Sequence, residues 1–569
     1  MRTRQVSTGR VAGVGIGIVL SAGLLSVPPS TFSLLPVATL DLLASLARMF
    51  LAYLLSLVFA LGYGYFASAQ RSAERVMIPI LDILQSVPIL GFFPVAIIFF
   101  VGLTGPQSLV GPNLASIFLI FTSMSWNMAF GVYESLKGLP NDMREATLSF
   151  GSRGFQRLRR VLFPATVNRL VYNSQLSWAA GWFFLVAAEI ITTSTSSVSL
   201  PGIGSFLLIQ AQSGDIPNVA LGVILLIVLI VLLDVFVWRP LARWAEKYRY
   251  DQTPSGESDA GVEARTSVPW GRVAGRVMQG MVSGLRRVQA PFASLGSRTL
   301  ARRGPVHPHS RARTAIKYVI LGTILVIGWF VLIFLSVVIY QSLFGQPISS
   351  FVMAQIRTVP LALGLSLLRI LAAYAVCVVV AIPLAIFLTR NPRAGRVGLP
   401  LVQIVASVPA TALFPLLAIV LLRFVGDEAL SVLVLVTGMI WYVFFNFVSG
   451  LRGIPPDLEE TARSFGLKKG RYYRRLIFPG SYPAFITGSI TAFGSGWNTL
   501  ILAEYLVYGS NPPIVNLLGI GELLQIGSLP GEGALLVVSL LTLVGAVIAF
   551  NEALWKPLYR RVVEKYHFD

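Results

Sequence analysis

The chain has 569 residues, of which 55% are hydrophobic and only 12% are charged. A soluble domain carries about 25% charged residues, so this composition predicts a membrane protein instead. The formal net charge is +20, but the basic residues lie between apolar segments, which is typical of the cytoplasmic side of a membrane protein and not of a nucleic-acid partner.

The first half of the chain contains six apolar segments long enough to cross a bilayer. They lie at 11–27, 42–67, 77–102, 114–133, 168–191 and 218–238. The first of them also has features of a signal peptide, because the basic sequence MRTRQVSTGR precedes it. No clear Ala-x-Ala cleavage site follows, and Pro28–Pro29 stands where cleavage would be needed, so we interpret this segment as an uncleaved helix.

An elbow is predicted between the fourth and fifth segments, at 142–164, where the sequence reads DMREATLSFGSRGFQRLRRVLFP. Asp142 with Glu145 three residues later is typical of a capping box at a helix start. Gly151 stands where a helix would end in the left-handed conformation. A basic amphipathic segment follows, and Pro164 is expected to begin the next helix.

Residues 250–315 interrupt the apolar pattern with a polar, Gly- and Arg-rich sequence. We predict that they form a cytoplasmic linker between a first unit at 1–249 and a second unit at 316–569. Apolar residues from Trp270 to Val288 recur at helical spacing against arginines, which indicates an amphipathic helix on anionic headgroups. Four glycines in the same stretch weaken this interpretation, and a flexible basic linker is an equal alternative.

The second half also has six apolar segments, which makes twelve predicted transmembrane helices. They lie at 317–340, 360–388, 399–424, 430–449, 483–507 and 533–555. The segments that this layout places outside the cell contain one basic residue, Arg357, whereas the segments inside are rich in arginine and lysine. The positive-inside rule therefore predicts a multi-pass protein of the plasma membrane with both termini in the cytoplasm.

The second half repeats the first. Its elbow at 457–479, DLEETARSFGLKKGRYYRRLIFP, follows the first elbow at a constant offset of 315, without a gap. Other pairs match at offsets of 315 to 321: Trp182 with Trp497, Glu189 with Glu504, and Ser86-Val87-Pro88 with Ser407-Val408-Pro409. Both elbows must face the cytoplasm, so the halves are predicted to be parallel repeats with a substrate path between them.

Both elbows resemble the EAA loop of ABC importer permeases, in which a glycine follows the Glu of Glu-Ala-Ala by six residues and a proline follows thirteen later. The matching residues are Glu145, Ala146, Gly151 and Pro164 in the first copy and Glu460, Ala462, Gly466 and Pro479 in the second. Each copy departs from the pattern at one alanine, replaced by Thr147 and by Thr461. The sequences SVPILGFFPVAIIFFVG, GWFFLVAAEII and LPGIG narrow the resemblance to permeases for nitrate, sulfonate or taurine, and bicarbonate, in a duplicated and fused form.

This resemblance implies an all-α fold of about 12 transmembrane helices in two parallel six-helix repeats, like a type I ABC importer permease. It also implies elbows that insert into two cytoplasmic ATPase subunits, which bind ATP and Mg, and an extracytoplasmic solute-binding protein that delivers a small anion. The sequence has no Gly-Lys-Ser/Thr phosphate loop, so the nucleotide must bind another polypeptide. The chain has one cysteine, and none of its histidines belongs to a cluster of residues typical of a metal site. We therefore expect no catalytic residue, cofactor or metal in this chain.

Two glutamates are candidates for the substrate path. Glu189 and Glu504 end apolar segments, where a carboxylate is a functional candidate by default. We leave open whether they line the path or bond to nearby hydroxyls such as Thr192 and Thr193, and we expect burial to favour the neutral acid. Arg369 is the intramembrane basic residue that stands out. The other path candidates are Ser86, Pro88, Trp182, Ser407, Pro409, Trp497 and Asn498, for which proline kinking and plain packing are the alternatives.

We therefore predict a permease subunit driven by separate ATPase subunits. The main alternative is a secondary transporter with parallel repeats, which needs coupling-ion carboxylates and no elbow that docks on an ATPase. A membrane scaffold without transport activity is a third possibility. Co-purification with an ATPase subunit separates the first from the second, and substrate-dependent ATPase stimulation separates it from the third.

Overall fold

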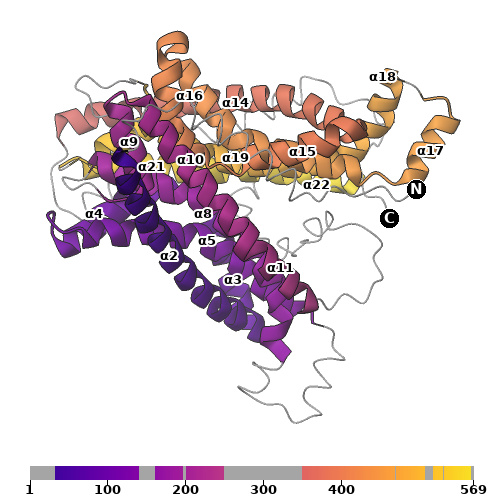
Figure 1. Cartoon of the computed structure of the whole chain (residues 1–569), viewed down its shortest axis with the longest axis horizontal. Coiled ribbons are helices and arrows are strands. Elements are labelled where there is room, and N and C mark those ends of the chain that lie inside the picture. Colours follow the sequence, from indigo (N-terminus) through magenta and orange to yellow (C-terminus); the bar gives the residue numbers. More distant parts are fainter. Residues whose placement is uncertain are drawn as a thin grey trace, which may run out of the picture. The chain divides into compact units, whose positions relative to one another are not determined.

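The computed structural model describes residues 33–139, 161–195, 200–248, 349–467, 469–505, 517–529 and 531–565. Every regular element within these ranges is a helix, which confirms the predicted all-α fold (Figure 1). The linker at 250–315, most of the first elbow and the predicted spans 11–27 and 317–340 lie outside the described residues.

The helices follow one another in the same order in both halves. The first half consists of α2 (Leu35–Ala69), α3 (Arg71–Ser86), η2 (Ile89–Phe92), α4 (Phe93–Thr104), α5 (Val110–Lys137), α8 (Phe163–Thr195), α9 (Ile203–Gln212), α10 (Ile216–Leu233), η4 (Asp234–Trp238), α11 (Arg239–Ala245) and η5 (Glu246–Tyr248). The second half consists of α14 (Ser350–Arg390), α15 (Pro392–Ala406), α16 (Ala410–Arg452), α17 (Pro456–Ser464), α18 (Lys469–Tyr472), η9 (Tyr473–Ile477), α19 (Phe478–Tyr505), α20 (Ile520–Gly527), α21 (Gly533–Phe550), η10 (Asn551–Trp555) and α22 (Lys556–Lys565).

A glycine marks the same turn in each half. Gly105, just after α4, has φ 89°, and Gly426, at the equivalent position of the repeat, has φ 73° at a kink inside α16. This left-handed backbone conformation strongly favours glycine. The part of α16 before Gly426 is therefore the counterpart of α4, and the part after it is the counterpart of α5.

Seven helical segments of the described chain are long and apolar enough to cross a membrane, and a bent pair adds an eighth. The bent pair joins Pro392–Ala406 to Ala410–Leu421 at 86°. In α19, by contrast, glycine, serine, threonine and asparagine residues interrupt the apolar sequence. These spans make the chain a multi-pass membrane protein.

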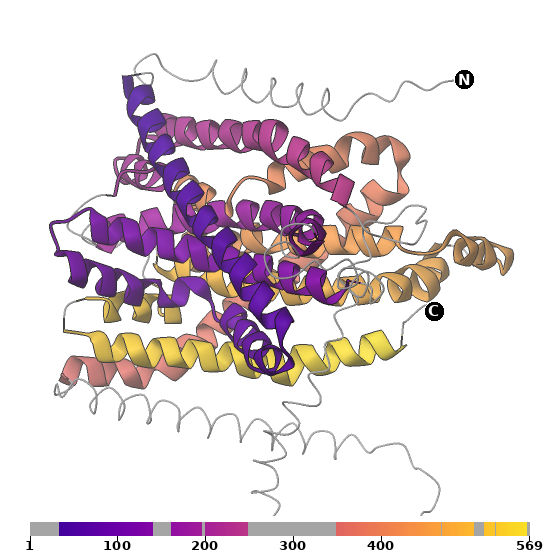
Figure 2. The same cartoon turned by 90° about the horizontal axis from the view of Figure 1, so that it is seen from below.

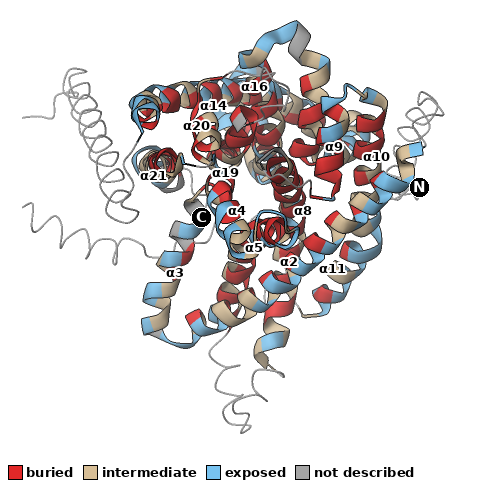
Figure 3. Ribbon diagram, turned by 90° about the vertical axis from the view of Figure 1, so that its left-hand side faces the viewer, coloured by how far each residue is buried: buried red, intermediate tan, exposed pale blue. Residues whose placement is uncertain are grey.

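Small side chains let α2 pack closely on its neighbours. Ala38, Ser45, Ala52 and Ala60 are fully buried on one face of α2, which contacts α5, whereas large apolar residues such as Phe66 are exposed on the other face. Figure 3 shows this division between buried and exposed faces along α2. Small residues at helix contacts and large apolar residues outside are typical of helices that meet lipid.

Several helices continue through a proline by means of a π turn. The backbone N–H groups of Arg239, Phe478 and Lys556 each bond to the carbonyl five residues earlier, and a proline follows each of them. Proline lacks an N–H and clashes with the carbonyl four residues back, and the wider turn accommodates both effects. The predicted helix starts at Pro164 and Pro479 are therefore corrected, because π turns lie directly before α8 and α19. Figure 2 shows one such uninterrupted run, from α21 through η10 into α22 in yellow.

Candidate functional site

The second elbow is a short helix, a glycine turn and a basic helical segment, as the sequence predicts. α17 ends at Ser464, and Gly466 has φ 67°. The Leu467 N–H donates to the carbonyl of Ala462 at 3.0 Å, which closes the C-terminal turn of α17 in the way typical of a left-handed glycine. The predicted capping box is wrong here, because α17 begins at Pro456 and no side chain caps it.

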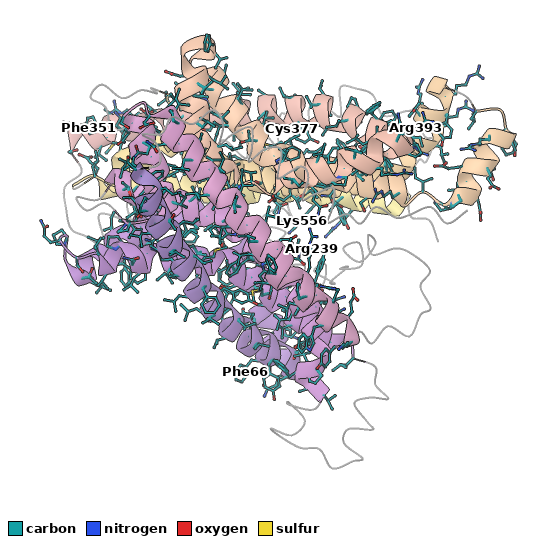
Figure 4. All side chains as sticks on the ribbon, in the orientation of Figure 1. Phe66, Arg239, Phe351, Cys377, Arg393 and Lys556 are labelled. Atoms are coloured by element: carbon teal, nitrogen blue, oxygen red, sulfur yellow. The ribbon has the colours of Figure 1, made fainter. Side chains whose placement is uncertain are left out.

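An ion pair holds this elbow against the end of α14. Arg390, the last residue of α14, contacts Glu459 at 2.6 Å, and its guanidinium lies 5.9 Å from the ring centre of Tyr472. Partial burial raises the pKa of the Tyr472 phenol, which therefore stays neutral at physiological pH. In Figure 4, Arg393 labels this end of the second half and Phe351, near the start of α14, labels the opposite end.

The elbow leaves a large apolar side chain uncovered. Phe465 is 81% exposed, whereas Ala462 is buried. The two residues are three apart in the sequence, but only Ala462 packs inward. Of the first elbow, Pro164 is described as the second residue of α8, and Glu145, Ala146 and Gly151 lie outside the described residues.

Both predicted helix breaks are present at the Ser-Val-Pro sequences. Val87 and Pro88 are extended between α3 and η2, and Pro409 is extended between α15 and α16. Pro88 and Pro409 are buried, whereas Ser407 is exposed and its hydroxyl donates to the Ile404 carbonyl at 2.7 Å. The side chain of Ser86 lies outside the part of the chain that the structure describes.

Each break is bonded to a long helix of the other half, α19 or α8. The Leu90 N–H, just after the first break, donates to Oδ1 of Asn498 in α19 at 3.2 Å. The Thr411 hydroxyl, just after the second break, donates to the carbonyl of Phe183 in α8 at 3.1 Å. Leu90 and Thr411 are equivalent positions, as are Phe183 and Asn498. The two contacts are thus related by the repeat but are made by different chemical groups.

Glu189 lies in a buried polar cluster that joins α2, α8 and α9. Its carboxylate accepts from the Ser45 hydroxyl and from the Gly204 N–H, both at 2.7 Å, and forms an ion pair with Arg48. Arg48 also donates to the carbonyl of Pro201. A carboxylate at the start of α9 is further stabilised by the positive end of the helix dipole.

The same cluster recurs in the second half around Glu504. Its carboxylate accepts from the Ser366 hydroxyl at 2.8 Å, from Arg369 at 2.6 Å and from the Gly521 N–H at 2.9 Å. Arg369 also donates to the carbonyl of Leu518 at 3.0 Å. Both glutamates are buried, Glu189 completely.

Close packing explains the Gly-Ile-Gly sequences beside these carboxylates. A Cβ atom on Gly204 would lie 2.7 Å from the Val186 carbonyl oxygen, and one on Gly521 would lie 2.7 Å from the carbonyl oxygen of Ile501. No larger residue fits without displacing helix backbone. Glycine is therefore required at these two positions for close approach.

The side chains bonded to the glutamates come from other helices. They are Ser45, Arg48 and their repeats Ser366 and Arg369, which lie far earlier in the chain. Ser45 in turn accepts from the Ile203 N–H at 2.9 Å, so its own hydrogen points to the carboxylate. The glutamates act as acceptors in these contacts, as a carboxylate beside an arginine does. That burial favours the neutral acid stays a prediction. The missed signal was the repeat itself, because Ser45 and Arg48 recur at the same offset as the Ser-Val-Pro sequences.

The remaining path candidates lie in packed surroundings. Trp182 and Trp497 are both buried, and Trp182 meets Trp178 edge to face at 6.4 Å. Asn498 is partly buried, and besides accepting from Leu90 it donates to the carbonyl of Gly494 at 3.1 Å. The burial of both tryptophans agrees with the alternative that they pack in the protein interior and do not line the path. No group of three or more metal-ligating side chains occurs among the described residues.

Each half of the chain is similar in sequence to a known family of proteins. Residues 52–239 and 378–551 match the family described as binding-protein-dependent transport system inner membrane component. The bicarbonate transport system permease protein CmpB of Synechococcus elongatus is 26% identical over 144 residues, which are 25% of this chain and 51% of that protein. The nitrate import permease protein NrtB of Synechocystis has the same identity and coverage. The taurine transport system permease protein TauC of Escherichia coli is 27% identical over 144 residues, again 25% of this chain and 51% of that one.

The matched part of the chain spans about half the length of each of these relatives. The two family matches lie in the two halves, and together they cover more than half of the chain. They include α3 to α10 in the first half, and α15 to α21 in the second. The chain therefore belongs to the family of binding-protein-dependent transport system inner membrane components, with one copy of the domain in each half.

Proposed function

We propose that this chain is the membrane permease of an ATP-driven importer for a small anion. The units at 1–249 and 316–569, joined by the linker, enclose the translocation path. The relatives named above support this substrate class, since their names specify bicarbonate, nitrate and taurine. The family model matches both halves, which supports the proposal that this single chain replaces a pair of permease subunits.

The observation that carries the proposal is the exposed second elbow. Its short helix α17 is followed directly by an uncovered phenylalanine, Phe465, and the elbow is held to the membrane helix α14 by the ion pair between Arg390 and Glu459. An exposed apolar side chain on a short helix suits insertion into a groove of a partner protein. When a partner bound at the elbow moves, α14 and α19 transmit its displacement to the membrane domain, because the elbow is bonded to α14 and leads into α19.

The partners follow from this role. Two cytoplasmic ATPase subunits hold ATP and Mg, one at each elbow, and the termini of the chain lie on the same side. An extracytoplasmic solute-binding protein delivers the anion to the opposite side. The chain itself contributes no catalytic residue and no cofactor. The Ser-Val-Pro breaks, Asn498 and the residues beside them control passage between the halves.

The test compares two equally exposed phenylalanines. Phe465 lies on the elbow and Phe424 lies before the kink in α16, and each is 81% exposed. The full chain is reconstituted in vesicles with its ATPase subunits and receptor, and uptake of labelled nitrate, bicarbonate and taurine is measured. Phe465→Ala is expected to reduce ATP-dependent uptake at least tenfold, whereas Phe424→Ala leaves it near the wild-type rate.

Two results oppose the proposal. Uptake that proceeds without ATPase subunits, driven by an ion gradient, establishes the secondary transporter. Equal effects of Phe465→Ala and Phe424→Ala, with both proteins correctly inserted, show that the elbow does not bind the ATPase.

A further inference from the structure

The side chains bonded directly to the two arginines differ in one charged residue. In the second half, Nε and Nη2 of Arg369 contact the two carboxylate oxygens of Glu428 at 2.7 and 2.6 Å. In the first half, the residue at the equivalent position is Asn113, whose Oδ1 accepts from Nε of Arg48 at 2.8 Å. The second arginine is therefore bonded directly to two carboxylates, and the first to one.

The two arginines also present different edges. Nη2 of Arg48 donates to the Pro201 carbonyl, so backbone closes that side of the guanidinium. In Arg369, Nη1 makes both the bond to Glu504 and the bond to the Leu518 carbonyl. Among the described residues, only Glu428 bonds to the Nε and Nη2 edge of Arg369.

Glu428 is well placed to move away from the Nε and Nη2 edge of Arg369. Its side chain is 64% exposed, whereas that of Arg369 is 4% exposed. It lies two residues after Gly426, whose non-helical conformation interrupts α16. The exposed carboxylate regains water when it moves away, but the buried guanidinium then needs another acceptor on this edge. Arg369 remains paired with Glu504 after that movement.

We propose that the Nε and Nη2 edge of Arg369 is a binding site for a small planar oxyanion, such as nitrate or bicarbonate, which takes the place of the Glu428 carboxylate. Two coplanar oxygens on such an anion match the two parallel N–H donors of a guanidinium. One negative charge replaces another, so the charge balance with Glu504 is kept. The identity of the anion rests on the proposed function as an anion importer.

The site lies at the end of the second half that is remote from its elbow. Arg369 and Arg390 are both in α14, and the length of helix between them corresponds to about 30 Å. Glu504 likewise lies at the end of α19 far from η9 and the elbow. An anion that arrives from the side opposite the ATPase subunits therefore meets Arg369 before it reaches the elbow end of the membrane domain.

The experiment labels the full-length protein in lipid nanodiscs with phenylglyoxal, which modifies accessible guanidinium groups, and locates the modified arginines by mass spectrometry. Nitrate is the probe, and chloride at equal ionic strength is the control. Nitrate is expected to protect Arg369 in the wild type. In Glu428→Ala, where the competing carboxylate is gone, half-maximal protection is expected at a nitrate concentration at least tenfold lower.

The first half supplies the matched control. In Asn113→Ala, labelling of Arg48 is expected to stay insensitive to nitrate, because the Pro201 carbonyl still occupies its Nη2. Glu428→Gln, which keeps the size of the side chain, serves if Glu428→Ala does not fold. A second readout is thermal unfolding, in which nitrate stabilises Glu428→Gln more than the wild type and chloride does not.

Absence of nitrate protection at Arg369 in both the wild type and the Glu428 variants overturns the proposal, as does equal protection of Arg48. Neither readout depends on transport. Nitrate protection without ATP-driven uptake refutes the importer and keeps the site, whereas uptake without protection refutes only the site.

Discussion

Glu189 and Glu504 provide a direct test of the buried ion pairs at the level of single residues. Glu→Gln replaces a carboxylate oxygen by an NH₂ group that faces arginine, serine and backbone donors. Leaving a buried charge without its partner costs about 3–5 kcal/mol. The full effect is expected for Glu189→Gln. A smaller one is expected for Glu504→Gln, because Glu428 still pairs with Arg369. Thermal unfolding of the two variants in nanodiscs measures the difference.

A double variant is the control for this prediction. Arg48→Met combined with Glu189→Leu removes both charges and is expected to be less destabilised than Glu189→Gln alone, since neither member of the buried pair is left without the other. If Glu189→Gln unfolds at the wild-type temperature, the glutamate is a neutral acid in the native protein, as its position in an apolar sequence first suggested.

Sequence reasoning found the two glutamates and singled out Arg369, but it did not find Arg48 or pair either arginine with a glutamate. Repetition at a constant offset identified Glu189 and Glu504, because both lie in the same segment as the matched tryptophans. Arg48 belongs to a different helix, far from Glu189 in the chain, and no local pattern relates the two residues. Its position is fixed only when the small residues of α2 pack against neighbouring helices. Polar contacts between distant helices depend on that packing, and for this reason they were not predicted.

At the scale of elements, two glycines are expected to differ in what they support. Gly466 has φ 67° with no atom near its Cβ position, whereas a Cβ on Gly521 would meet the Ile501 carbonyl. Gly466→Ala adds about 1 kcal/mol of left-handed strain to the exposed elbow only. We expect it to reduce ATP-dependent uptake while the unfolding temperature is unchanged. Gly521→Ala is expected to lower the unfolding temperature. Uptake and thermal unfolding of both variants, measured together, check this, and the reverse pattern contradicts it.

The boundaries of these elements were predicted unevenly. The glycine stop of α17 was predicted correctly, because positive φ is a local demand that the sequence displays. The prolines were interpreted as helix starts, yet Pro479 lies inside a helical run that continues through η9 into α19. Whether a helix ends at a proline or passes it by a π turn depends on the packing of the flanking segments. Ile477, fully buried in η9, supplies such packing here.

At the scale of the whole molecule, the parallel repeat was predicted but the way the halves meet was not. η2 of the first half packs on α19 and α21 of the second, and α16 of the second half packs on α8, α9 and α10 of the first. Gly91 in η2 has side chains of α21 and α19 within van der Waals distance of its Cβ position. These contacts join segments from opposite halves of the chain, and they hold the halves together within the membrane.

Because these contacts lie outside the linker, we expect the halves to assemble as two separate chains. Residues 1–250 and 315–569 are co-expressed, one with an affinity tag, and co-purification and uptake are measured. A covalent linker mainly raises the effective concentration of one half near the other, and confinement of both halves to one membrane supplies part of the same effect. Wild-type pieces are therefore expected to co-purify and transport.

Asn498→Leu serves as the control in both forms of the protein. It removes the hydrogen bond from Leu90 and leaves a backbone N–H unpaired, at a cost of about 1–3 kcal/mol. In the fused chain the linker keeps the halves together, so the substitution is expected to leave assembly intact. In the split protein, where only non-covalent contacts act, it is expected to reduce co-purification severalfold. If the wild-type pieces insert stably and do not associate, the linker contributes more than a tether.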